Sequence, residues 1–161
     1  VYLRLTGGSD LVLREYELDA IVRRAVRRFA GEFIGRKLKL CYEPLHVSCV
    51  TDEKWLLFVI EQVLSNALKY TRAGSITIEL EAPKTLVIRD TGIGVAPEDL
   101  PRIFEKGYTG YNGRGDQKAS GLGLYLCRTI CKRLGHTITA SSVPDHGTAI
   151  RITLEQRQVR E

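Results

Sequence analysis

The sequence contains no methionine among its 161 residues and only one tryptophan. Because the chain opens on Val1 without an initiating methionine, we expect it to be a fragment of a longer protein. It also lacks any run close to the roughly 18 apolar residues that a membrane-spanning helix requires. The composition, 43% hydrophobic and 27% charged, is that of an ordinary globular protein, and the length is sufficient for one buried core.

The four cysteines form no C-x-x-C motif, and no histidine lies at metal-ligand spacing from them. Cys127 and Cys131 lie four residues apart in a helical stretch, where a pair is poorly placed for a disulfide. We therefore expect free, reduced cysteines in the core and a cytosolic setting.

The net charge is +5, from 24 Lys and Arg against 19 Asp and Glu, and the excess is concentrated in residues 1–40. Such a charge can indicate nucleic-acid binding, but here Arg23, Arg24, Arg27 and Arg28 share the outer face of an expected helix. A run of this kind is usually a solvated helix face, so we expect no nucleic-acid partner. The alternative is docking on another domain or on an acidic partner.

Apolar residues recur at helical spacing in three stretches, at about residues 19–35, 53–70 and 123–134. Asp19 is predicted to cap the first helix, Thr51 or Asp52 the second, and Gly135 to stop the third. Six stretches are typical of strands: residues 38–43, 46–50, 75–81, 85–90, 137–142 and 148–155. The first two of these strands are expected to be joined by a turn at Pro44.

The order of these elements is helix, two strands, helix, two strands, loop, helix, two strands. Paired strands between single helices imply an α/β fold, a two-layer sandwich with a mixed, largely antiparallel sheet and three main helices on one face. The other face of the sheet would carry little cover, so exposed and buried side chains should alternate along the strands. We expect residues 1–18 to lead in from a preceding domain and residues 19–161 to form this domain.

Residues 96–120 break the pattern with a short helix-like piece and then a glycine-rich stretch that has no apolar period. A loop of this length inside a compact domain is usually a lid or a binding loop, or else disordered. Lys106, Arg114 and Lys118 give it cationic groups, and we expect it to move when no ligand is bound.

Polar side chains gather on one side of the second helix, where Gln62, Asn66, Lys69 and Tyr70 lie opposite the apolar side. They offer amides for a metal, an amine for a phosphate and a phenol for stacking. The alternative is a solvent-facing polar stripe, which amphipathic helices have by default.

Glycines adjoin three predicted elements. Asp90 ends a buried strand and is followed by Gly92 and Gly94, a spacing that suggests a phosphate loop, although a carboxylate beside a phosphate argues against it. Gly121 and Gly123 open the third helix, whose free N–H groups can bind an anion, or they form a flexible connection. Thr148 follows Gly147 at the start of the last strand. The glycine could serve only to form a turn, and the threonine could be present only because it favours a strand.

Together these features resemble the catalytic and ATP-binding domain of bacterial sensor histidine kinases, in the superfamily shared with gyrase-type topoisomerases and heat-shock chaperone ATPases. The resemblance extends from about residue 15 to residue 154 and implies a Bergerat-type fold. "SNALKYT" resembles the N box, "DTGIG" the first glycine box, "IF" at residues 103 and 104 the F box, and "SGLGLYL" the second glycine box. More narrowly, the second helix and "KGYTGYNGR" resemble the intramembrane-sensing kinases that answer peptides such as bacitracin.

The resemblance implies binding of Mg²⁺ and ATP by particular residues. Asn66 would coordinate Mg²⁺, Lys69 would pair with a phosphate, and both are the expected catalytic residues. Tyr70 would pack beside adenine, and Asp90 would accept from the exocyclic amine, with Thr148 assisting through water. The other expected nucleotide-binding residues are Gly92 and Gly94 beneath the purine, Phe104, Lys106 and Tyr108 in the lid at about residues 96–120, and Gly121, Leu122, Gly123 and Leu124 at the phosphates.

The resemblance also implies partners. The γ-phosphate would pass to a histidine on a separate dimerisation domain and then to the receiver domain of a response regulator. The full-length protein would be a homodimer with its catalytic domain in the cytoplasm, anchored in the bacterial plasma membrane, with a peptide-sensing ABC transporter as a further partner. None of His46, His136 and His146 lies in the helical setting of a phosphoacceptor, so the target histidine is expected upstream.

One departure from the family pattern leaves alternatives open. The family often carries a second asparagine four residues before the N-box asparagine, where this chain has Gln62, and a metal contact there is open. Gyrase-type and chaperone-type hydrolases place a glutamate at that position to activate water, and a glutamine cannot act as a base. The other alternative is a regulatory nucleotide-binding module without transfer activity.

Overall fold

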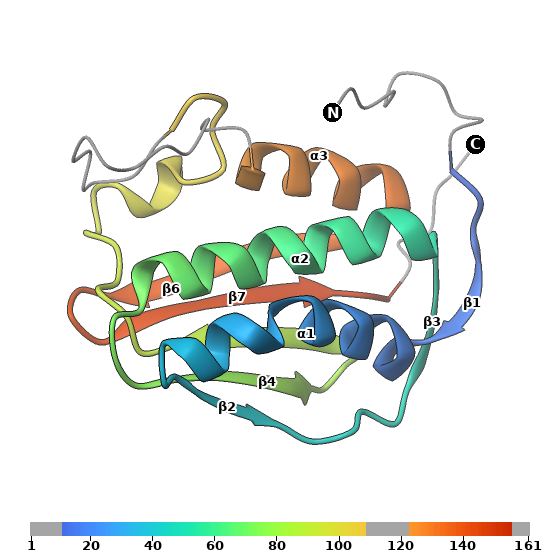
Figure 1. Ribbon diagram of the computed structural model, residues 1–161. Helices are drawn as coiled ribbons and strands as arrows, with labels where there is room; N and C mark the ends of the chain where they lie inside the picture. The colour runs from blue at the N-terminus through green and yellow to red at the C-terminus, as the bar shows by residue number, and fades with distance from the viewer. Residues whose placement is uncertain (1–10, 109–122, 156–161) are drawn as a thin grey trace.

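Three helices cover one face of a five-stranded sheet in the computed structural model, which describes residues 11–108 and 123–155 (Figure 1). The helices are α1 (Leu18–Gly35), α2 (Glu53–Tyr70) and α3 (Gly123–Leu134), with a short 3₁₀ helix η2 (Leu100–Arg102). The strands are β1 (Arg14–Glu17), β2 (Lys39–Tyr42), β3 (Ser48–Thr51), β4 (Ser75–Glu81), β5 (Thr85–Asp90), β6 (Thr137–Val143) and β7 (Gly147–Thr153). The predicted two-layer α/β sandwich is confirmed.

The main sheet has the strand order β2-β4-β5-β7-β6. β2 pairs with β4 in parallel, and the other neighbours are antiparallel, so the predicted mixed, largely antiparallel sheet is confirmed. On the face away from the helices, Arg89 binds Glu79 at 2.7 Å and Arg151 binds Glu81 at 3.1 Å. Val87 lies on that face with no exposed surface, since it pairs with Glu79 on one side and Arg151 on the other. Charged side chains thus shield the centre of a face that no helix within residues 11–108 and 123–155 covers.

The predicted pairing of the strands at residues 38–43 and 46–50 is wrong. β2 belongs to the main sheet, whereas β3 pairs with β1 in a separate two-stranded sheet. Asp19 holds in place the segment that connects β2 to β3, because its Oδ1 accepts from the Tyr42 hydroxyl and from the Leu45 N–H. The predicted cap at Asp19 is therefore wrong as well: α1 begins at Leu18, and the carboxylate is used for a tertiary contact.

Of the two predicted caps of α2, Thr51 and Asp52, the N-cap is Asp52. Its Oδ1 accepts from the Trp55 N–H at 3.1 Å, which satisfies one of the free donors in the first turn. Its Oδ2 accepts from the Val12 N–H at 2.7 Å, and the residue is 5% exposed. One buried carboxylate therefore ties the chain before β1 to the start of α2.

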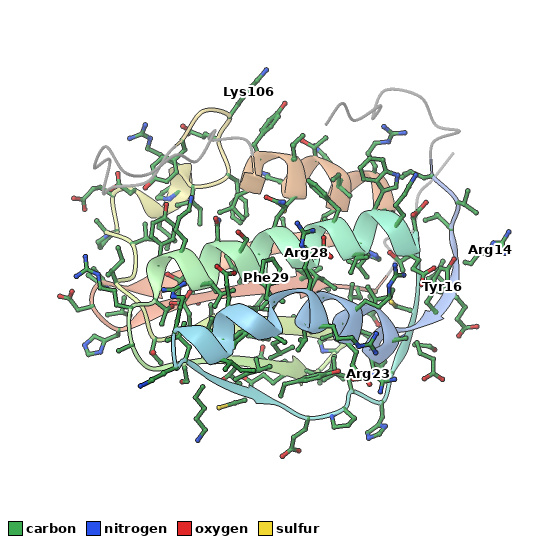
Figure 2. The ribbon with its side chains drawn as sticks, in the orientation of Figure 1. Arg14, Tyr16, Arg23, Arg28, Phe29 and Lys106 are labelled. Atoms are coloured by element: carbon green, nitrogen blue, oxygen red, sulfur yellow. The ribbon has the colours of Figure 1, made fainter. Side chains whose placement is uncertain are left out.

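The arginine run lies as predicted, and so do Cys49, Cys127 and Cys131, whereas Cys41 is half-buried and lies outside the core. All four cysteines are free, and Cys127 and Cys131 are buried on α3. The four arginines of α1 are exposed, and Arg24 and Arg28 bind Glu53 and Glu61 of α2 at 3.1 and 2.8 Å. In Figure 2, Arg28 lies on the side of α1 that faces α2. Within the described ranges, no helix is both long and apolar enough to cross a bilayer.

His136 should make the stability of the fold depend on pH. It is 3% exposed, its Nε2 lies 3.0 Å from the Thr51 hydroxyl, and its Nδ1 has no partner among the described residues. Burial lowers the pKa of His136 to about 4 from 6.5. Between these values the unfolded chain binds the proton and the folded chain does not, so the free energy of unfolding falls as the pH is lowered.

We expect His136 to account for a loss of about 3 kcal/mol between pH 6.5 and pH 4. The measurement is urea unfolding across this pH range for the wild type and for His136→Gln, whose difference isolates this histidine from the carboxyl groups. His146→Gln is the matched control, because His146 is an exposed histidine in the turn between β6 and β7, and it should keep the wild-type pH profile. Identical profiles for all three proteins would contradict the expectation.

Candidate functional site

The C-terminal half of α2 presents the predicted polar stripe outside the core. Ala67 and Leu68 face the core, with 4% and 2% of their surface exposed. Asn66 and Tyr70 are half-buried, and Lys69 is exposed with its Nζ 5.6 Å from the centre of the Tyr70 ring. An amide, an ammonium group and a phenol therefore lie together at the end of this helix, as predicted from their spacing.

Asp90 is buried at the end of β5, with 8% of its surface exposed. Its Oδ1 accepts from the Gly92 N–H at 2.8 Å and from the Thr148 N–H at 3.2 Å. Burial raises the pKa of Asp90 more than these two hydrogen bonds lower it. Within the described part of the chain no hydrogen bond reaches Oδ2, so this oxygen can accept from a ligand.

The loop after Asp90 lies directly against the end of α2. The Ile93 N–H donates to the Tyr70 carbonyl oxygen at 3.1 Å. A Cβ on Gly92 would lie 2.2 Å from that same oxygen, so no larger residue fits. This loop brings the buried carboxylate of β5 and the polar stripe of α2 into one site.

Gly92 and Gly94 are required by close contacts of this loop with other backbone segments, which the sequence did not reveal. We expected Gly92 and Gly94 to allow the backbone to approach a ligand. The contacts in the structure are with the protein's own backbone: a Cβ on Gly94, where φ is +74°, would lie 2.3 Å from the Val143 carbonyl oxygen. The approach of these two residues to a purine stays a prediction.

The first turn of α3 lies beside Gln62 of the polar stripe. A Cβ on Gly123 would stand 3.0 Å from the Gln62 Oε1, so a glycine allows this side chain to come close. Leu124 is half-buried and packs against the core. Gly121 and Leu122 lie outside the described residues, so their predicted contact with phosphate is untested.

The described part of the expected lid is attached to α3 by Phe104. This side chain is 9% exposed and belongs to the core, and the Arg128 guanidinium of α3 lies 5.9 Å from its ring centre. The Lys106 Nζ lies 5.8 Å from the Tyr125 ring centre, and Figure 2 shows this lysine pointing outward. Tyr108 packs against the core and beneath the Arg102 guanidinium. Residues 109–120, including the other predicted cationic groups, lie outside the described ranges.

Two residues at this site were missed by the sequence analysis. The buried Thr71 hydroxyl lies close to Gly92 and has no partner among the described residues. Ser142 contacts both Val95 and Thr148. Neither residue type signals a site, but pairing the strand at residues 137–142 with the last strand would have placed Ser142 opposite Thr148.

The described residues contain no group of three or more His, Cys, Asp or Glu side chains able to hold a metal ion. Mg²⁺ keeps several waters and often binds through one or two protein oxygens and phosphate oxygens, so the Asn66 amide fits such an ion. The role of Asn66 as a metal ligand stays a prediction.

The chain matches the family described as "Histidine kinase-, DNA gyrase B-, and HSP90-like ATPase" over residues 51–158. It is 34% identical to the sensor histidine kinase YxdK of Bacillus subtilis, covering 94% of this chain and 50% of that protein. It is 33% identical to the sensor protein BceS of Halalkalibacterium halodurans, covering 90% and 44%. The chain thus spans about half the length of these curated relatives.

Solved structures share the fold. The catalytic domain of histidine kinase ThkA superposes with a TM-score of 0.76 at 20% identity, over 88% of this chain and 96% of that one. The histidine kinase AdeS of Acinetobacter baumannii gives 0.65 at 25% identity, over 93% and 73%. The family match covers most of the chain and includes the α2 stripe, Asp90 and Thr148. The chain therefore belongs to the family of histidine kinase-, DNA gyrase B- and HSP90-like ATPases.

Proposed function

We propose that this chain is the ATP-binding catalytic domain of a sensor histidine kinase, which presents the γ-phosphate of ATP to a histidine on a separate dimerisation domain. The observation that carries the proposal is the buried Asp90 carboxylate, held beside Thr148 and against the end of the helix that bears Asn66 and Lys69. A desolvated acceptor at this place suits a purine with a donor amine.

The residues of the chain would act by binding and orientation. The Oδ2 of Asp90, which has no partner among the described residues, would accept from the adenine amine, and the Tyr70 ring would pack beside the base. Lys69 is exposed, so its ammonium group is free to meet a phosphate. Asn66 would hold Mg²⁺, which when bound neutralises phosphate charge. Phosphoryl transfer depends mainly on such positioning and charge stabilisation, and little covalent chemistry is required of the protein.

The contacts of α2 argue against the hydrolase alternative. Gln62, at the position where hydrolases carry their base, has no ionisable group. The adjacent Glu61 faces α1, where its carboxylate binds Arg28 at 2.8 Å. A glutamate directed toward α1 is not placed to activate water beside Gln62 and the start of α3.

The partners belong to the same proposal. The similarity to proteins named as sensors supports a response regulator as the receiver of the phosphate and a dimer formed through an upstream domain. Attachment of the longer protein to the plasma membrane, with this domain in the cytoplasm, and a peptide-sensing ABC transporter as partner rest on the sequence resemblance.

The deciding experiment uses the longer protein that includes the upstream helices. After incubation with labelled ATP and Mg²⁺, we expect acid-labile phosphate on a histidine outside this chain, detected by its alkali-stable label. Steady release of inorganic phosphate without labelled protein would favour the hydrolase. ATP binding with neither product would favour the regulatory module.

Asn66→Ala should weaken ATP binding in the presence of Mg²⁺ by about tenfold and leave metal-free binding nearly unchanged, because the amide oxygen is lost as a metal ligand. Calorimetric titration of ATP with Mg²⁺ or with a chelator measures both values. Ser65→Ala, the neighbouring half-buried position, is the matched control and should leave both unchanged. Equal losses under the two conditions would remove the metal role of Asn66.

A further inference from the structure

Ser142 connects its own strand β6 with β7 and with the loop that follows Asp90. It lies in β6, directly opposite Thr148 of β7. Its Oγ accepts from the Val95 N–H at 2.7 Å, donates to the Gly147 carbonyl oxygen at 2.9 Å and lies 3.0 Å from the Thr148 Oγ1. One hydroxyl thus connects the loop that follows Asp90 with the start of β7.

The number of hydrogens fixes the direction of these bonds. A serine hydroxyl has one hydrogen to donate and two lone pairs with which to accept. The Gly147 carbonyl oxygen can only accept, so it takes the single Ser142 hydrogen. The Val95 N–H occupies one lone pair, and the other receives the hydrogen of the Thr148 hydroxyl. The Thr148 hydroxyl is left with lone pairs alone for any other neighbour.

Thr148 is also held next to Asp90 by its backbone, since its N–H donates to the Asp90 Oδ1 at 3.2 Å. The carboxylate and the hydroxyl therefore both offer only acceptors. A hydroxyl that only accepts takes one hydrogen from a neighbouring water and leaves the other hydrogen of that water for an acceptor on the base. Adenine has a donor amine at its sixth position and an acceptor at N1, whereas guanine has a carbonyl and an N–H there.

We propose that Ser142 is a specificity-determining positioning residue, which fixes the Thr148 hydroxyl as an acceptor and thereby favours adenine over guanine. This inference rests on the proposed function, because it requires that Asp90 and Thr148 face the base of a bound nucleotide. In Ser142→Ala the Thr148 hydroxyl would lose its acceptor and become free to donate toward the site.

The test is a pair of calorimetric titrations, with ATP and with GTP, for the wild type and each variant in the presence of Mg²⁺. We expect the ratio of ATP affinity to GTP affinity to fall about tenfold in Ser142→Ala. Ser142→Thr retains a hydroxyl and should keep the ratio of ATP affinity to GTP affinity at the wild-type value. Ser141→Ala is the matched control, because the Ser141 Oγ accepts from Arg151 on the opposite face of the sheet.

A second measurement separates positioning from stability. In a Thr148→Val background there is no hydroxyl to orient, so adding Ser142→Ala should leave the ratio unchanged. Equal loss of ATP and GTP affinity in the single Ser142→Ala variant, or an unchanged ratio, would overturn the role of Ser142 alone. A wild-type chain that does not prefer ATP to GTP would overturn the proposed function and this inference with it.

Discussion

Asp90→Asn should lower the affinity for ATP by about 100-fold or more and leave the free energy of unfolding nearly unchanged. The asparagine Oδ1 can still accept from the Gly92 and Thr148 N–H groups, so the loop keeps its two hydrogen bonds. The second oxygen becomes an NH₂ group, and this donor would meet the donor amine of adenine. Burial already disfavours the charged form of Asp90, which raises its pKa, so a neutral side chain adds no strain to the fold.

The measurement combines calorimetric ATP titration with urea unfolding of the same variant. Asp145→Asn is the matched control: Asp145 is exposed in the β6–β7 turn at φ +68°, a conformation that asparagine tolerates. It should leave both values at the wild-type level. Unchanged ATP affinity in Asp90→Asn would show that the carboxylate does not contact the base. A loss of affinity matched by a loss of stability would give Asp90 a purely structural role.

Gly147→Ala should destabilise the chain by about 4 kcal/mol or more, a large part of the stability of a typical domain. At this residue φ is +105°, and a Cβ would lie 1.9 Å from the Asp90 carbonyl oxygen. The obstacle is backbone of the central strand β5, which cannot move aside without breaking its pairing with β4 and β7. The backbone strain of alanine at this positive φ and the overlap of its Cβ with β5 therefore both destabilise the folded state.

Urea unfolding at neutral pH measures this loss, and Gly31→Ala provides the opposite case. Gly31 lies in α1 with nothing within 4 Å of an added Cβ. Alanine there should stabilise the chain by about 0.5–1 kcal/mol, because glycine inside a helix is unfavourable. A loss below about 1 kcal/mol for Gly147→Ala would mean that the start of β7 shifts at little cost.

Local signals in the sequence were sufficient for the helices. Asp52 and the apolar period that follows it predicted α2 to within a residue, and the flanking glycines gave the bounds of α3. Caps and periods act over a few residues, so they can be recognised without knowledge of the rest of the fold. Asp19 shows the limit, because the same residue type before an apolar period was recruited by Tyr42 and Leu45.

Contacts between distant residues could not be predicted in the same way. β2 and β3 are neighbours in sequence, yet each pairs with a strand elsewhere in the chain, and no local pattern specifies this. At the site, the burial of Asp90 followed from the apolar strand before it. Its bond to the Thr148 N–H, 58 residues away, and the place of Ser142 between them follow only from strand register.

The hydrogen bond from the Val12 N–H to the Asp52 Oδ2 joins the segment ahead of β1 to the start of α2. A fragment that started at Asp19 would lose β1, and the backbone of β3 that pairs with it would become an open edge. It would also leave the Asp52 Oδ2 buried without its donor. Unpaired edges of this kind are templates for pairing with other chains, and native proteins cover them. We therefore expect a fragment that starts at Asp19 to be less stable and more prone to self-association than one that includes Val12.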